Sequence, residues 1–159
     1  MLNLSDFRRG DVRYTDFVAE MTLWGKRISF DVAFEEELGK TEETLAAALP
    51  AINEKLAFIE QNAEAVKLST TAEAHLDELA NDWEYEAYED NGGDPDEYPE
   101  ITAEQFREGL FPVALGMEFG ESTDRCQAYL ELLCEPDHFA GHRIHIEIDE
   151  ENEIGCEGI

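Results

Sequence analysis

Arg143-Ile-His-Ile-Glu-Ile148 is the stretch of sequence that indicates the fold most directly. Isoleucine alternates there with His145 and Glu147, which is the period-two pattern of a strand with one buried face and one solvated face. Three more apolar runs lie nearby, at residues 111–119, 126–134 and 154–159. Each is too short for a stable helix and is bounded by Gly, Asp, Asn or Pro. The C-terminal third is therefore predicted to be a meander of antiparallel strands.

A hairpin is predicted near the N-terminus. Residues 17–24 and 27–34 each alternate along the chain, and Gly25-Lys26 between them is a turn signal. The face that is expected to enter the core carries Ile28, Phe30, Val32 and Phe34. Trp24, beside the turn, is interpreted as a residue that packs over the sheet edge rather than as a binding aromatic.

Helical segments are expected between the two sets of strands, from residue 41 to residue 88. Thr41 has the character of an N-cap, and apolar residues follow at spacings of three and four. Pro50 lies within this stripe and is expected to kink the helix or to start a new one. A second helix is expected from about Asn62 into the Trp83 region, with a possible interruption at Ser69-Thr70-Thr71.

The short helix that precedes residue 111 is predicted from a capping box formed by Thr102 and Gln105. Together these elements predict one α+β domain over residues 1–159, with an N-terminal hairpin, a helical middle and a C-terminal meander. We expect a mainly antiparallel sheet of five to six strands, covered on one face by two to three helices.

The composition restricts the kinds of partner. The chain has 39 acidic and 11 basic residues, a formal net charge of −28, and 43% hydrophobic residues. A polyanion of this kind is repelled by nucleic-acid backbones and by anionic membrane surfaces, so we expect neither as a partner. A cationic protein is the partner that this charge favours, although the acidity is also explained by solubility alone.

The cysteines indicate a reducing compartment. Cys126 and Cys134 are eight residues apart in one predicted strand, at roughly 3.3 Å per residue, which is too far for a disulfide. Cys156 leaves the number odd. No apolar stretch approaches the roughly 20 residues of a membrane span, and no signal peptide is apparent. We therefore expect a cytoplasmic protein with reduced thiols.

The most acidic segment, Asp82 to Glu100, is the candidate partner surface. It contains nine carboxylates and four aromatic residues, and no Lys or Arg occurs between Lys67 and Arg107. Aromatic residues that anchor a complex and charges that steer it are typical of protein-binding surfaces. A solvated helix end followed by a loop is the alternative interpretation. The residues predicted to bind a partner are Trp83, Glu86, Tyr88, Glu89, Asp94 and Asp96.

Two places in the sequence are candidates for metal binding. Read from Asp90, the loop places Pro95 where an EF-hand requires glycine, so calcium binding is not expected. Asp137, His138 and His142 are a possible zinc set, but the neighbouring proline and glycine favour a loop in which these side chains bond to the backbone. We therefore expect no metal and no cofactor.

Several short motifs resemble an uncharacterised bacterial family, domain of unknown function 2262. They are Ile101-Thr-Ala-Glu-Gln-Phe-Arg-Glu-Gly-Leu110, Phe139-Ala-Gly-His-Arg-Ile144, the closing Glu157-Gly158, and Asn81 with Trp83. The resemblance covers the last half of the chain well and the first half loosely, and it implies no activity. Some similar small acidic bacterial proteins are immunity proteins of toxin systems, which is an analogy only.

These observations leave two hypotheses of different kinds. The first is a non-enzymatic protein-interaction module, an immunity-type inhibitor that masks a basic partner. The second is a small enzyme or ligand-binding domain that uses the region of His138 and His142. No catalytic residues are assigned, because phosphate-loop, nucleophile-elbow and zincin motifs are absent from the sequence and no carboxylate pair stands out.

Overall fold

A seven-stranded sheet forms the body of the protein, as seen in a computed structural model that describes residues 1–10 and 15–159. The strands follow one another across the sheet in chain order, and neighbouring strands are antiparallel except for the parallel pair β3 and β4. The N-terminal hairpin and the C-terminal meander are therefore parts of one sheet. Its strands are β1 (Arg8–Arg9), β2 (Phe17–Leu23), β3 (Lys26–Phe34), β4 (Leu110–Phe119), β5 (Gln127–Cys134), β6 (Ile144–Ile148) and β7 (Ile154–Gly158).

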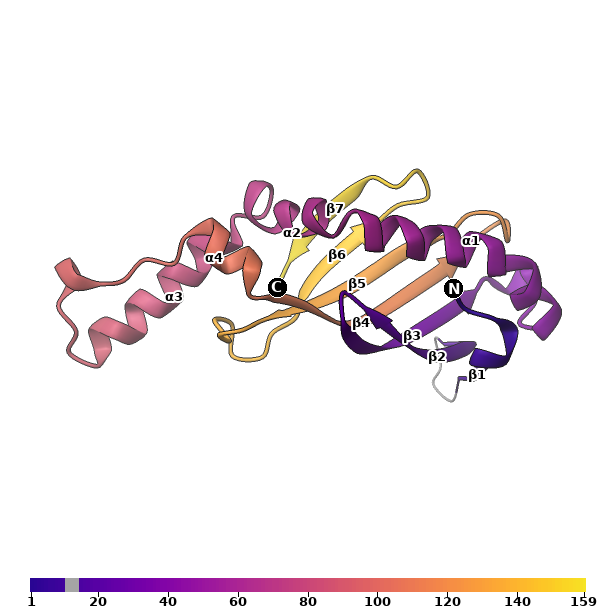
Figure 1. Ribbon diagram of the computed structural model, residues 1–159, viewed down its shortest axis with the longest axis horizontal. Coiled ribbons are helices and arrows are strands. Elements are labelled where there is room, and N and C mark those ends of the chain that lie inside the picture. Colours follow the sequence, from indigo (N-terminus) through magenta and orange to yellow (C-terminus); the bar gives the residue numbers. More distant parts are fainter. Residues whose placement is uncertain (11–14) are drawn as a thin grey trace.

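The four α-helices of the described residues lie between β3 and β4, where a parallel pair needs a long crossover connection. They are α1 (Glu42–Gln61), α2 (Ala63–Ala72), α3 (Leu76–Asp90) and α4 (Ala103–Glu108). Figure 1 shows α1 and α2 lying across the sheet, whereas α3 extends beyond the end of the sheet. The α+β class and the mainly antiparallel sheet are thus confirmed, and the helical cover consists of α1 and α2.

The predicted numbers of elements were too low. The described residues form seven strands rather than five to six, and four α-helices rather than two to three. Strand β1 has only two residues, too few to produce a periodic pattern. The helix expected from Asn62 into the Trp83 region is divided into α2 and α3 at Glu73–His75, where His75 adopts a φ of 50°.

Hydroxyl groups near the end of α2 explain why this helix ends at Ala72, just after Ser69-Thr70-Thr71, where the sequence suggested an interruption. Ser69 and Thr70 donate to the carbonyl oxygens three residues earlier, each at 2.7 Å. Such side-chain bonds compete with the helical backbone pattern. The helix continues for only a few residues beyond them.

Pro50 lies inside α1 and does not end it, so the expected start of a new helix at this residue is wrong. The apolar stripe is buried on both sides of the proline, at Leu45 and Ala48 before it and at Ile52 and Ile59 after it. Burial of both halves against the sheet keeps the helix continuous, because tertiary packing outweighs the loss of one backbone donor.

The first hairpin turns at Trp24 and Gly25, one residue earlier than expected. Both residues have positive φ, 47° and 76°, as a tight two-residue hairpin requires. The indole of Trp24 reaches α1, and its Nε1 donates to the carbonyl of Ile59 at 3.4 Å. The four side chains expected in the core, Ile28, Phe30, Val32 and Phe34, are all buried.

None of the helices in the described part of the chain is long and apolar enough to cross a membrane.

Candidate functional site

The acidic arm, which we define as residues 76–102, projects from the body of the protein (Figure 1). It consists of α3 and the segment that returns from its end to α4. Only Leu76 and Ala80 are buried in α3, and both lie in its first turns. The first part of the helix is therefore anchored in the core, while the rest depends on contacts within the arm and with the loop at 135–142.

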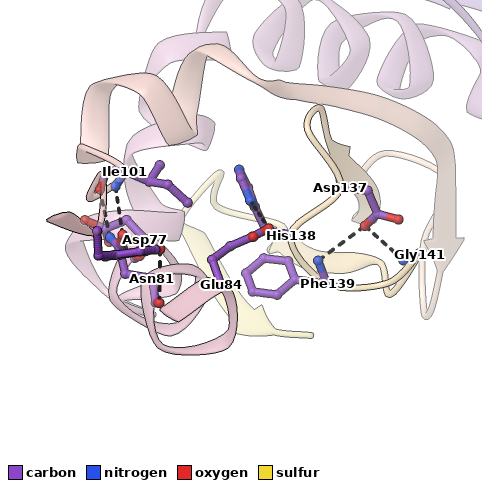
Figure 2. Close-up of polar contacts among 9 residues, drawn as sticks. Asp77, Asn81, Glu84, Ile101, Asp137, His138, Phe139 and Gly141 are labelled. Atoms are coloured by element: carbon purple, nitrogen blue, oxygen red, sulfur yellow. Dashed lines mark hydrogen bonds and ion pairs between the residues drawn. The ribbon is translucent and has the colours of Figure 1, made fainter. Parts of the chain in front are cut away.

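Asn81 holds the returning segment against α3 (Figure 2). Its Oδ1 accepts a hydrogen bond from the Ile101 amide at 2.7 Å, and its Nδ2 donates to the Ile101 carbonyl at 2.8 Å. Nδ2 also donates to the carbonyl of Asp77 at 3.0 Å. One amide side chain thus pairs with both backbone groups of a residue in a distant segment, as a strand partner would.

Tyr98 is the second link within the arm. Its hydroxyl donates to Asn81 oxygens at 3.3 and 3.4 Å, and its ring lies edge-on to Tyr85 and Tyr88 at 5.4 and 5.6 Å. Burial, and then the charges of Glu84 and Glu100, raise the pKa of Tyr98, so the phenol remains a donor. A side chain at Gly93 would meet the ring of Tyr88, so the glycine permits this close return of the chain.

The base of the arm contacts the loop at 135–142. Nδ1 of His138 lies 3.0 Å from Oε1 of Glu84, with the imidazole 7% exposed and the carboxylate 41% exposed (Figure 2). Beside this pair, the indole of Trp83 lies edge-on to the buried ring of Phe139 at 5.6 Å. These contacts fix the direction in which α3 leaves the body.

Asp137 organises its own loop. Its Oδ1 accepts hydrogen bonds from the amides of Phe139 at 3.2 Å and Gly141 at 2.9 Å (Figure 2). His142 is exposed, and its ring lies edge-on to Trp83 at 6.4 Å. No group of three or more His, Cys, Asp or Glu residues in the described ranges could hold a metal ion. Asp137, His138 and His142 therefore have separate partners in this structure.

The residues predicted to bind a partner lie on both segments of the arm, α3 and the returning segment. Glu86 and Glu89 are exposed on α3, and Asp94 and Asp96 are exposed in the returning segment. Trp83 is 39% exposed although it packs on Phe139. Tyr88 instead faces Tyr98 and Gly93, within the arm.

The three cysteines do not have the properties of catalytic nucleophiles. All three are free, and burial raises the pKa of each thiol, that of Cys126 to about 11. A thiol of this kind stays protonated at neutral pH and is a poor nucleophile. The absence of a disulfide agrees with the sequence expectation.

The comparisons with known proteins agree with the motifs. The family model "Uncharacterized protein conserved in bacteria (DUF2262)" matches residues 9–159. The chain belongs to this family. No curated protein and no solved structure was found to match it.

Several residues of the motifs that resemble DUF2262 lie at the base of the arm, whereas Glu157 and Gly158 lie in β7. Thr102 and Gln105 form the capping box that starts α4, and this helix places the buried ring of Phe106 at 6.0 Å from Phe139. Asn81 and Trp83 join the same region from α3. These motif residues of α3, α4 and the loop at 135–142 thus help to attach the arm to the sheet.

Two contacts of this region were missed in the sequence. The pair of Glu84 and His138 joins residues 54 positions apart, and Asn81 reaches across 20 positions. Neither pair carries a local spacing signal. The one signal in the sequence that singled out Asn81 is its place among the residues that resemble the family.

Proposed function

We propose that this DUF2262 protein is a non-enzymatic interaction module of the bacterial cytoplasm that binds a cationic protein through its acidic arm. An immunity-type role, in which the arm masks a basic functional surface of a toxin, is the form of this function that the charge favours. The proposal rests chiefly on one observation: the arm that projects beyond the sheet (Figure 1) is rich in exposed carboxylates.

The charges of the arm support this proposal because they are largely uncompensated. Asp82 to Glu100 contributes nine carboxylates, and the ion pair found for this segment among the described residues is the one between Glu84 and His138. Exposed charges of one sign raise the rate of encounter with an oppositely charged protein.

Trp83 supports the proposal as the anchor of such a complex. Glu86 and Asp90 follow it by three and seven residues in α3, so the three side chains share a face of the helix. A half-exposed tryptophan that is held by Phe139 and surrounded by carboxylates has the composition of a binding hot spot with a charged rim. Tyr88 supports the complex indirectly, because it shapes the returning segment.

The test compares matched charge variants. The partner is recovered by pull-down with the wild-type protein, and binding kinetics are measured at two salt concentrations. In the arm variant, Glu86 and Glu89 become Gln while Asp94 and Asp96 become Asn. We expect slower association and a weaker salt dependence. The control variant changes exposed carboxylates outside the arm to Gln, namely Glu36, Glu37, Glu43 and Glu54.

Trp83→Ala tests the anchor separately. We expect it to speed dissociation by about thirtyfold, which corresponds to roughly 2 kcal/mol for a hot spot. Trp83→Tyr retains an aromatic ring against Phe139 and should lose less. The proposal is wrong if the arm variant associates like the control variant and Trp83→Ala dissociates like the wild type.

A further inference from the structure

A hollow of about 360 Å³ lies on the face of the sheet that is opposite the core. Its floor is at Gly116 and Ala114 in β4, between Asp31 of β3 and Tyr129 of β5. The register places Asp31 beside Gly116 and Gly116 beside Tyr129, so the three positions form one row across the sheet. Glycine provides no side chain in this row, and a Cβ at Gly116 would meet nothing within 4 Å.

The walls of the hollow are charged and mostly acidic. Asp31, Glu118 and Glu131 contribute carboxylates, whereas Arg143 and His145 are the basic groups among its lining residues. The guanidinium of Arg143 is already paired with Glu131. Asp31 has no ion pair or side-chain hydrogen bond with the residues that the structure describes, and it is only partly exposed.

Gly116 and Asp31, at the centre of the hollow, are residue types that are unfavourable in the middle of a strand. Glycine weakens a strand interior and often marks a place where a ligand approaches the backbone closely. Aspartate is disfavoured in strands. Burial, and then the charge of Glu131, raise the pKa of Asp31, so its charged form is destabilised where it stands. Local rules broken at adjacent positions are typical of functional sites rather than of simple surfaces.

We propose that this hollow binds an organic cation, an ammonium or guanidinium group, with Asp31 as its counter-ion, Gly116 as its floor and Tyr129 as its wall. A cation satisfies a carboxylate that has no ion-pair partner among the described residues, and the three carboxylates of the lining disfavour an anion. The lack of a side chain at Gly116 leaves room for the ligand's carbon atoms above the backbone. The site uses no residue of the acidic arm, so it does not depend on the function proposed for the arm.

The ligand is either a free small molecule or a basic side chain presented by a protein, and one titration distinguishes them. The amide resonances of the full-length protein are followed by NMR while ethylguanidinium, butylammonium or the peptide acetyl-Gly-Arg-Gly-amide is added, with sodium chloride at equal ionic strength as the reference. We expect saturable shifts centred on Asp31, Gly116 and Tyr129. Tighter binding of the small cations indicates a free ligand, and tighter binding of the peptide indicates a side chain.

Two variants make the result specific. Asp31→Asn should weaken binding at least fivefold, and Gly116→Val should abolish it by filling the hollow. The valine has open space around its Cβ and suits a strand, so this variant is expected to stay folded. Glu54→Gln, an exposed position on α1, is the matched control and should bind like the wild type, as should the arm variant. Shifts that do not saturate, or that persist equally in Asp31→Asn and Gly116→Val, would overturn the proposal.

Discussion

At the scale of single residues, Asn81 has the greatest influence on the candidate surface. Its amide group replaces a strand partner for Ile101, and it also receives the hydroxyl of Tyr98. These bonds hold the end of the returning segment against α3. The acidic arm keeps a defined shape because a few polar bonds, rather than a large apolar core, close it.

Asn81→Ala should destabilise the protein by about 1–3 kcal/mol, because two partly buried backbone groups of Ile101 lose their partners. Chemical denaturation measures this change, and amide exchange at Ile101 should accelerate more than exchange in the sheet. Asn91→Ala is the control: Asn91 bonds only to Ala87 within the exposed end of α3. Equal losses in the two variants would contradict the assigned role of Asn81.

The raised pKa of Asp31 predicts how the free energy of unfolding depends on pH. Because the folded state raises the pKa of this carboxyl above its ordinary value of 3.8, the folded state binds the proton more tightly than the unfolded chain does. Asp31 therefore lowers the free energy of unfolding as the pH rises through the folded-state pKa, and the full penalty is present at neutral pH.

Asp31→Asn should remove that penalty. We expect Tm to rise at pH 7 by a small amount, on the order of 2 °C, and the difference from the wild type to shrink as the pH falls toward 4. Thermal unfolding monitored by circular dichroism between pH 4 and 8 measures this, with Glu54→Gln as the control. A less stable Asp31→Asn at pH 7 would mean that the carboxylate already has a favourable partner in the folded protein.

At the scale of elements, the loop at 135–142 is a joint between the sheet and α3. It contributes His138 to the pair with Glu84 and Phe139 to the contact with Trp83, while Asp137 bonds to the loop's own amides. Side chains with a structural role of this kind have little freedom to converge on a metal ion.

The purified protein should accordingly contain no stoichiometric zinc. Elemental analysis after exposure to equimolar zinc and desalting measures the content, and His138→Ala and His142→Ala should leave it unchanged. One zinc ion per chain that is lost in both variants would contradict this expectation. It would also restore the hypothesis of a metal-dependent function at this loop.

At the scale of the whole molecule, the net charge of −28 is the dominant electrostatic property. The repulsion among exposed carboxylates opposes the compact state, and added salt screens it over a Debye length of about 10 Å near 0.1 M. Tm should therefore rise between low and moderate salt, by about 2–4 °C for each kcal/mol of repulsion relieved.

A differential scanning calorimetry series in sodium chloride tests this expectation. The variant with Glu36, Glu37, Glu43 and Glu54 changed to Gln carries fewer charges and should respond less to salt. A Tm that stays flat or falls with salt would show that the charges are compensated locally.

The sequence by itself determined the parts of this protein that have a local physical cause. Alternation identified the strands and their buried faces, as in residues 143–148 and in the hairpin, because the side-chain period of a strand is fixed by its pleat. Capping residues located the start of α1 at Thr41 and the start of α4 at Thr102. The short motifs similarly indicated the family.

Features that depend on contacts between residues far apart in the sequence could be seen only in the tertiary structure. Pro50 stays within α1 because packing on both sides outweighs its local cost, and β3 pairs in parallel with β4 across the whole helical segment. The arm projects because few of its side chains are buried, and Asn81 closes it over 20 residues. The hollow at Gly116 arises from the register of three strands. Pairings of this kind have no periodic signal, since their free energy comes from contacts that exist only after the chain has folded.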